Sequence, residues 1–400
     1  MSTDGKIMST DGNRIFSLDV MRGITIVGMI VFNTCSGYHY AQLYHAPWIG
    51  FTLADTAFPF FVFIMGMTTW LSLRKYDFRP TGRVLRRIAV RAVGLILVCW
   101  AFDLLGSLLF TLDSGGDILS IFSEMRFTGV LVRLGVCYGV CALAALYINH
   151  KRFPYVIAAL LIGYFILLLC GHGFDRTPDN ILGIVDRALL GESHMCNDMG
   201  IDPEGILSTI PAIAHTMLGF WMAAMCLPRQ DNKASLSPLL SGGGGGRLFF
   251  YGSLLLLSGF LLSGACPVSK KIWSPTFVMI TSGAASLLLG VLIEILDVRQ
   301  RGVRVGKFFS VFGANPLFLY LLSEGILWPL MLIKVGGEQA MVNGQLSMVN
   351  EQSLWDYLFR SIFVPLFGEQ GGDLAFALVN VFFCWLVGFI LYRRKIFIRL

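Results

Sequence analysis

Charged side chains are scarce in this sequence of 400 residues. They make up 14% of the chain, about half the share of ordinary soluble domains, whereas hydrophobic residues make up 55%. The mean hydropathy of +0.69 excludes an ordinary soluble fold. The same shortage of charge, with an aromatic content of 13%, excludes a disordered chain, because such a chain could not stay solvated. The composition predicts a protein embedded in lipid.

Uncharged apolar runs of about 20 residues are long enough to cross the hydrocarbon core of a bilayer. Such runs predict an all-α polytopic membrane protein with about ten transmembrane helices. We expect these helices at residues 18–38, 54–73, 89–110, 129–148, 155–172, 206–227, 248–264, 275–296, 311–333 and 374–392. Together they form a single transmembrane domain over residues 18–392, between terminal tails at 1–17 and 393–400.

A further stretch, residues 354–367, is too short to span and is interrupted by Asp356, Arg360 and Pro365, so we expect an amphipathic helix along the outer surface. The basic residues test this topology, since cytoplasmic loops are enriched in Lys and Arg. With ten spans, the side that holds both termini carries 22 of the 31 basic residues and the opposite side carries 7. The sequence therefore predicts that both termini are cytoplasmic.

Several common signatures are missing. No cleavable signal peptide is evident, so we expect the first span to be a permanent anchor. The tract SGGGGGR at 241–247 lacks the GxxxxGK[ST] pattern of a phosphate-binding loop and is typical of a flexible linker. His194 and Cys196 near Asp198 suggest a metal site only weakly, because this is a single ambiguous cluster, and no metal is expected. Cys196 and Cys266 are predicted on the same side, and whether they pair stays open.

Ionisable residues within spans are costly and by default face an internal cavity, so they are candidates for function. These residues are Asp19, Arg22, Asp55, Asp103, Arg133, Glu294 and Glu324. Asp19 and Arg22 are three residues apart on one helix, which places them side by side. This pair is explained equally well as a structural ion pair that fixes a helix end or as part of a functional site.

The first outer loop carries the most informative polar residues. It contains His45, Trp48 and Asp55, and Asn33 precedes it at the end of the first span. Histidine is the side chain best suited to accept a proton near neutral pH, and Asp55 could hold that imidazole in one tautomer. The alternatives are a simple loop histidine, an interfacial tryptophan and a charge at a helix start.

Basic residues form two further groups. Arg126 and Arg133 are two helical turns apart, so they share a face and could bind anions along a pore. The cytoplasmic segment 74–91 holds seven basic residues, among them Arg86 and Arg87. These basic residues are explained by the orientation of the protein in the membrane and by contact with anionic lipid head groups. The more specific alternative is a binding site for the phosphates of a polyphosphate cofactor.

Six segments, in order along the chain, resemble the heparan-α-glucosaminide N-acetyltransferase family. They are RIFSLDVMRGITIVGMIVFN (14–33), HAPWIGFTLADTAFPFFVFIMG (45–66), MRFTGVLVRLGVCY (125–138), DRALLG (186–191), DPEGILSTIPAI (202–213) and LYRRKIFIRL (391–400). The resemblance implies transfer of acetyl from cytoplasmic acetyl-CoA to the amine of a terminal glucosamine-type sugar across the membrane. It also implies a bacterial inner-membrane relative, because the lumenal domain and extra span of the animal lysosomal enzyme are expected to be absent.

The resemblance implies roles for individual residues. His45 corresponds to the catalytic histidine of the family's HAxWxG motif, Asn33 to the asparagine that precedes it, and Asp55 to the aspartate of the ADxxFP motif. The family's motif arginines correspond to Arg126 and Arg133. From the residues themselves we expect the acceptor to be bound by Trp48, Arg126 and Glu324, and acetyl-CoA by Arg133, Arg22, Arg86 and Arg87. The expected partners are acetyl-CoA, an amino-sugar or glycan acceptor and membrane lipid, with no nucleic acid and with a homodimer left open.

A transporter or flippase for an anionic or lipid-linked solute is the competing hypothesis. Buried charges and broken helices, such as the one expected at Gly313 to Pro316, also mark transport paths. Against this hypothesis, the ten spans show no evident internal repeat.

Overall fold

The structure is a computed structural model that describes residues 15–34, 37–196, 198–226, 244–342, 345–349 and 351–398. The glycine tract and most of the loop around it therefore lie outside the described residues. The helices are α1 (Phe16–Asn33), α2 (Ala57–Arg74), α3 (Gly82–Ser114), α4 (Ser120–Ser123), α5 (Val130–Tyr147), α6 (Phe153–Cys170), α7 (Ile181–Leu190), α8 (Thr209–Cys226), α10 (Gly244–Leu262), α11 (Pro275–Leu292), α12 (Val303–Ala314), α13 (Pro316–Gly325), α14 (Leu327–Leu332), α15 (Leu354–Leu358) and α16 (Val364–Arg393).

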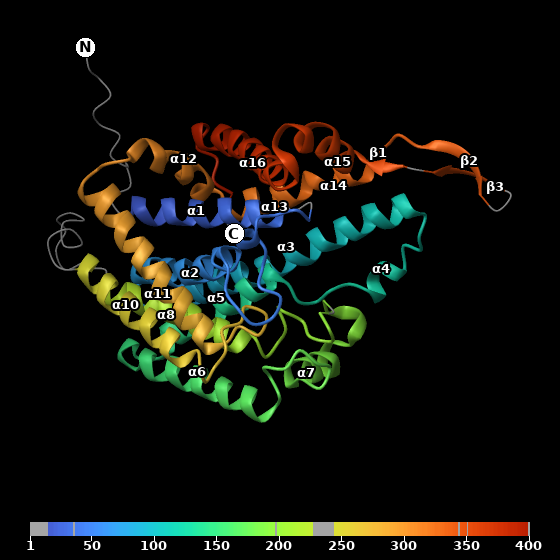
Figure 1. Cartoon of the computed structure of the whole chain (residues 1–400). Helices are drawn as coiled ribbons and strands as arrows, with labels where there is room; N and C mark the ends of the chain where they lie inside the picture. The colour runs from blue at the N-terminus through green and yellow to red at the C-terminus, as the bar shows by residue number, and fades with distance from the viewer. Residues whose placement is uncertain are drawn as a thin grey trace, which may run out of the picture.

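Most of these helices run roughly parallel to one another in one bundle (Figure 1). Within the described residues, nine helical segments are long and apolar enough to cross a membrane, and the bent pair α12 with α13–α14 makes a tenth. Each of the ten predicted spans overlaps one of them, which confirms the predicted fold class. The chain is an integral membrane protein.

The ninth predicted span is not one straight helix. α12 and α13 meet at an angle of 79° at Asn315, where Pro316 removes a backbone donor and starts the next helix. Asn315 is fully buried and binds the chain's last described residues: its Nδ2 donates to the Ile396 carbonyl (3.1 Å), and its Oδ1 accepts from the Ile398 N–H (2.7 Å). The break predicted from the sequence is therefore real, and the C-terminal segment is fastened to it.

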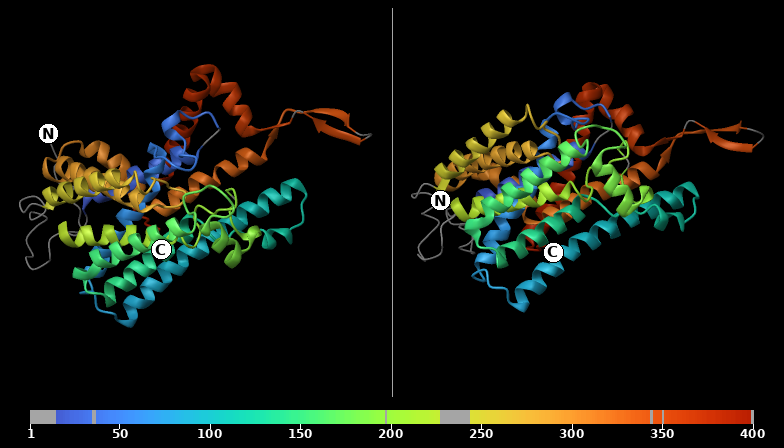
Figure 2. Two further views of the ribbon diagram at one scale, coloured as in Figure 1. Left: turned by 60° about the horizontal axis from the view of Figure 1, so that its bottom comes forward. Right: turned by 90° about the horizontal axis from the view of Figure 1, so that it is seen from below.

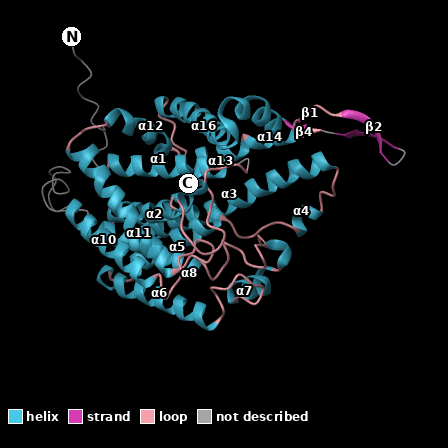
Figure 3. Ribbon diagram, viewed as in Figure 1, coloured by secondary structure: helices cyan, strands magenta, loops and turns pink. Residues whose placement is uncertain are grey.

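Residues 354–367 form a separate helical piece, as the sequence predicts. Gly368 lies inside α16 and has a φ of 72° and a ψ of 176°, a non-helical conformation that kinks α16 and separates this piece from the long helix that follows. Two short antiparallel strand pairs lie just before it: β1 (Lys334–Val335) pairs with β4 (Gln352–Ser353), and β2 (Glu338–Val342) pairs with β3 (Gln345–Val349). These short strands lie between residues 334 and 353, where no span is predicted, and they project from one end of the bundle (Figures 2 and 3).

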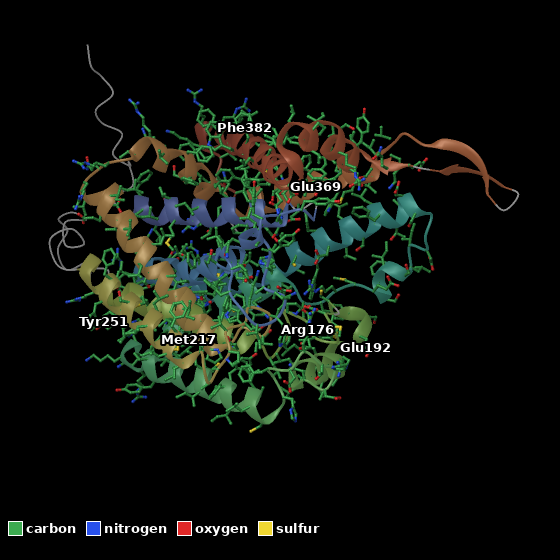
Figure 4. The ribbon with its side chains drawn as sticks, in the orientation of Figure 1. Arg176, Glu192, Met217, Tyr251, Glu369 and Phe382 are labelled. Atoms are coloured by element: carbon green, nitrogen blue, oxygen red, sulfur yellow. The ribbon has the colours of Figure 1, made fainter. Side chains whose placement is uncertain are left out.

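The bundle is held by pairs of helices that lie against each other: α1 with α12, α2 with α8, α3 with α5, and α10 with α11. Loops gather at the end of the bundle where α1 ends and α2 begins (Figure 1). Arg176 and Glu192, labelled in Figure 4, lie in this loop region; Arg176 precedes α7 in the chain and Glu192 follows it. The polar residues at this end have rigid helices beneath them, which is the arrangement that a site requires.

Candidate active site

The loop between α1 and α2 is folded around the carboxylate of Asp55. This side chain is fully buried, and its Oδ2 accepts hydrogen bonds from the N–H groups of Ala46 (3.1 Å) and Thr52 (3.2 Å) and from the Thr52 hydroxyl (3.0 Å). Thr52 and Asp55 cap each other at a 3-10 turn that leads into α2. The carboxylate therefore ties the middle of the loop, at Ala46, to its C-terminal part, at Thr52.

His45 lies beside this carboxylate. Its Nδ1 is 2.8 Å from Asp55 Oδ1, and 38% of its side chain is exposed. An ionised carboxylate only accepts hydrogen bonds, so Nδ1 carries the proton and the lone pair of Nε2 is left available. The structure brings together the two residues that the sequence suggested as an oriented base.

A second loop, between α10 and α11, packs against the first. The Gly50 N–H donates to the Val268 carbonyl (2.8 Å), and the Ser269 hydroxyl donates to the Trp48 carbonyl (2.5 Å). This pairing brings Lys270 to the imidazole: its Nζ is 3.1 Å from His45 Nδ1, 3.3 Å from Nε2 and 3.7 Å from Asp55 Oδ1. Sequence patterns do not indicate this contact, because it joins residues 225 positions apart through loop backbones that follow no periodic pattern.

A cavity of about 240 Å³ opens beside these side chains, and we call it the His45 cavity. Its wall is partly aromatic, with Phe58, Trp273 and Tyr320. Its polar lining consists of Asn33, His45, Arg133, Glu204, Lys270 and Lys271. A base, two carboxamide or guanidinium donors and a carboxylate thus converge on one small volume.

Arg133 is the most deeply buried cation of this cavity, with an exposure of 2%. Its Nη2 donates to the Pro203 carbonyl (2.8 Å) and to the Ser208 hydroxyl, and its guanidinium carbon lies 5.0 Å from the centre of the Trp273 ring. Nε and Nη1 are buried without a hydrogen-bond partner among the described residues. Unmet donors of a buried cation are costly, so an acceptor that reached these two nitrogens would stabilise the side chain.

Arg126 is engaged within the protein. Its Nη2 lies 2.6 Å from Asp202 Oδ1 and 2.7 Å from Glu204 Oε2. Burial acts to lower the pKa of Arg126, but the carboxylates of Glu204 and Asp202 outweigh it and hold that pKa above its usual range. Arg126 thus orients Glu204 at the wall of the His45 cavity and does not itself line that cavity.

The remaining acceptor candidates fall in different places. Asn33 lines the His45 cavity, and its Nδ2 donates to Glu324 Oε1 at 2.9 Å, so these two residues form one unit. Trp48 is 8% exposed, and its indole N–H donates to the Phe174 carbonyl at 2.7 Å. It packs in an apolar cluster with Tyr164 and lies outside the cavity lining.

The weak metal candidate of the sequence is taken up by other contacts. His194 Nδ1 is 2.8 Å from the Met125 carbonyl, and its ring stacks on Phe127. Cys196 and Cys266 are both free thiols, so the disulfide that the sequence left open is not formed.

A second cavity, of about 270 Å³, lies further along the bundle, and we call it the Arg22 cavity. Arg22 and Arg91 line it. Arg22 also contacts Asp19 (3.1 Å), the side-by-side pair that the helical spacing predicts, and the Gly313 carbonyl (3.2 Å). Arg86 and Arg87 are exposed on the first turns of α3, one turn before Arg91, and lie outside this lining.

The two cavities meet end to end. Met29 and Tyr320 line both of them. Along one face of α1 the order is Arg22 and Ile26 in the Arg22 cavity, Met29 in both, and Asn33 in the His45 cavity. Because an α-helix rises 1.5 Å per residue, this face spans about 16 Å from Arg22 to Asn33. An interrupted path therefore follows α1 through the bundle.

Comparisons with known proteins point to one family. A family model described as "Heparan-alpha-glucosaminide N-acetyltransferase, catalytic" matches residues 14–257. The chain is 28% identical over 363 residues to the human heparan-alpha-glucosaminide N-acetyltransferase, which covers 78% of this chain and 53% of that protein. It is 24% identical over 443 aligned positions to the mouse protein of the same name, which covers 97% of this chain and 61% of that protein. The chain thus spans little more than half the length of these relatives.

Proposed function

The chain belongs to the heparan-alpha-glucosaminide N-acetyltransferase catalytic family, and from this premise we propose that it transfers acetyl from acetyl-CoA to the amine of an amino sugar. The observation that carries the proposal is the His45–Asp55 pair at the wall of one cavity that meets a second, arginine-lined cavity end to end. This arrangement suits a donor and an acceptor that arrive from opposite sides of the membrane.

His45 serves as the general base in this proposal. An amino-sugar nitrogen reaches the site largely as an ammonium and must lose one proton to solvent before it can attack. As the nitrogen–carbon bond forms, Nε2 of His45 accepts a second proton from that nitrogen. The carbon–sulfur bond breaks, and His45 passes this proton to the departing sulfur. Asp55 keeps the other ring nitrogen, Nδ1, protonated throughout, so that Nε2 both accepts the proton and delivers it.

The basic residues are assigned to the donor. Bound acetyl-CoA supplies the acetyl group as a thioester. Arg22 and Arg91 line the cavity that would hold its arm, and Arg86 and Arg87 are exposed on α3 about one turn before Arg91, where phosphates could bind. The bias of basic residues toward the side of the termini supports a cytoplasmic position for this end.

Two donors of the His45 cavity suit the charge that develops on the thioester carbonyl. Arg133 has the unmet donors Nε and Nη1, and Asn33 presents its carboxamide from the end of α1. Preorganised donors of this kind stabilise an oxyanion by several kcal/mol, about 3 kcal/mol each in typical cases. On the acceptor side, the carboxylates of Glu204 and Glu324 favour the approach of an ammonium.

Purified protein, labelled acetyl-CoA and a panel of amino sugars provide the test. We expect an N-acetylated sugar from the parent protein and a loss of at least about a hundredfold in His45→Ala, the scale of general base catalysis. His172→Ala is the matched control, because His172 is an exposed histidine with 76% of its side chain in solvent. Parent-level turnover in His45→Ala would remove His45 from the mechanism. Movement of an amino sugar across vesicles without acetylation would instead support a transporter.

We propose direct transfer, because a deprotonated amine gains little from a covalent relay. Mass spectrometry of protein incubated with acetyl-CoA alone distinguishes the routes. Acetyl on His45 that is chased by the acceptor would establish a two-step route.

A further inference from the structure

The ammonium of Lys270 lies against the His45 ring in an uncommon position. Nζ is 3.1 Å from Nδ1 and 3.3 Å from Nε2. A donor in line with the lone pair of one ring nitrogen would be much farther from the other nitrogen. The nearly equal distances therefore place the ammonium over the ring, and the Nε2 lone pair is left for another proton.

We propose that Lys270 is a positioning residue that acts on His45 by charge: it opposes a lasting imidazolium, keeps the ring ready to accept a proton, and favours delivery of that proton to the leaving sulfur. This inference rests on the proposed acetyl transfer. It adds to that proposal a residue that lies beyond the matched segment 14–257 and that sequence patterns do not reveal.

The need for such a residue follows from Asp55. A carboxylate at 2.8 Å stabilises the protonated imidazole relative to the neutral ring, and so works against the form that accepts a proton. A base that has already taken up its proton cannot start the reaction. Lys270 Nζ lies 3.7 Å from the same Asp55 oxygen. Its positive charge therefore partly cancels the electrostatic attraction of that carboxylate for a proton on the imidazole.

Other charged groups around the His45 cavity are engaged elsewhere. Glu204 is paired with Arg126 at 2.7 Å, and Lys271 with Asp198 at 2.8 Å. Arg133 binds the loop that precedes α8, and Glu324 accepts from Asn33. Tyr320 lines the cavity from α13. Among the described cations of this cavity, Lys270 is the one that lies against the ring.

The surroundings of Lys270 also fix its position. The Ser269 hydroxyl holds the Trp48 carbonyl, and the Ser274 hydroxyl, which caps α11, accepts from the Ser269 N–H at 3.0 Å. The Lys270 side chain is only 19% exposed. Burial lowers the pKa of its ammonium, and the carboxylates of Asp55 and Glu204 act in the opposite direction.

The test is a titration that needs no turnover. Protein with isotope-labelled histidine is followed by NMR in detergent, and the His45 signal is identified by its loss in His45→Ala. We expect the pH at which the ring takes up its proton to be about one unit higher in Lys270→Met than in the parent. Lys270→Arg, which keeps the charge, is expected to stay close to the parent. The acidic limb of the pH–rate profile should move in the same direction and by a similar amount.

Lys271→Met is the matched control, because it removes the neighbouring cation that pairs with Asp198. We expect it to move the His45 titration far less than Lys270→Met. An unchanged titration in Lys270→Met, or an equal change in Lys271→Met, would overturn the inference. If Lys270→Met does not fold, Lys270→Gln takes its place with the same two outcomes. Failure of the parent protein to acetylate any amine would instead reject the proposed function, and the titration would still decide whether Lys270 controls the ring.

Discussion

Asp186, in α7, is almost fully buried, with an exposure of 1%. Its Oδ1 accepts from the Ile206 N–H at 2.9 Å, whereas Oδ2 has no hydrogen-bond partner among the described residues. Burial raises the pKa of this carboxyl to about 6, and the Ile206 N–H only partly opposes that shift. The charged form is therefore disfavoured in the folded protein.

A prediction about pH follows at the scale of this residue. Because the pKa of Asp186 is higher in the folded state than in the unfolded state, its contribution to stability is fully present below about pH 4 and is lost as the pH rises through about 6. Asp186→Asn keeps an acceptor for Ile206 and removes the charge, so we expect it to stabilise the protein at pH 7, by on the order of 1–3 kcal/mol, and to have little effect at pH 4. Thermal unfolding of purified protein at the two pH values measures this difference.

The exposed Asp179→Asn is the control and should leave the pH dependence unchanged. A stability of Asp186→Asn that follows that of the parent at both pH values would contradict the prediction.

Individual site residues differed in how far the sequence could locate them. His45, Asp55 and Asn33 lie within a short segment around one helix end, so motif and spacing indicated them. Lys270 was missed because a loop–loop contact carries it to the site. Trp48 and Arg126 belong to the predicted motifs, but neither side chain lines the His45 cavity. Each is held elsewhere by a hydrogen bond, Trp48 to the Phe174 carbonyl and Arg126 to the Asp202 carboxylate. Such side-chain directions depend on distant partners that one sequence does not reveal.

At the scale of elements, two helices approach each other at reciprocal glycines. A methyl group added at Gly66 of α2 would lie 1.9 Å from the Thr216 carbonyl, and one added at Gly219 of α8 would lie 2.1 Å from the Phe63 carbonyl. Both distances are far below van der Waals contact. The backbones of α2 and α8 therefore touch, which is how small residues hold helices together in lipid.

We expect Gly219→Ala to destabilise the protein by about 1–3 kcal/mol or more, since the two helices must separate to admit the methyl group. Gly163→Ala on α6 is the matched control: open space surrounds Gly163, and alanine favours a helix there by up to about 1 kcal/mol. Size-exclusion chromatography after heating measures both. Equal thermal stability of the two variants would argue against close packing of α2 on α8.

Hydrophobic run length predicted the helices well because the hydrocarbon core sets their length. It did not predict the full length of α3, which begins at Gly82 and carries Arg83, Arg86 and Arg87 in its first two turns, nor the strands between residues 334 and 353. Both lie outside uncharged runs, where no such constraint acts. The break at Asn315 was indicated because the Asn-Pro pair has a direct physical cause in the missing backbone donor.

At the scale of the whole molecule, Met29 and Tyr320 separate two cavities that lie end to end in a membrane protein. Two adjoining cavities in a membrane protein could also provide a path for protons across the membrane. A continuous column of water between them would conduct protons and discharge the membrane potential, at a cost to the cell that is unrelated to any reaction. Met29 and Tyr320, the thioether and the aromatic ring that line both cavities, are suited to exclude water between them, as hydrophobic constrictions do in channels.

The region lined by Met29 and Tyr320 should therefore block protons, and removing a large side chain there should make the protein permeable to protons. We expect vesicles containing Tyr320→Ala to lose a proton gradient faster than vesicles with the parent protein, measured with a trapped pH-sensitive dye under an imposed potential. Tyr147→Ala, at an exposed position on α5, is expected to stay tight. Equal tightness of Tyr320→Ala and the parent would mean that other side chains seal the path. A faster leak in Tyr320→Ala would give Met29 and Tyr320 a second task beside the proposed acetyl transfer: they would let an acetyl group pass and still block protons.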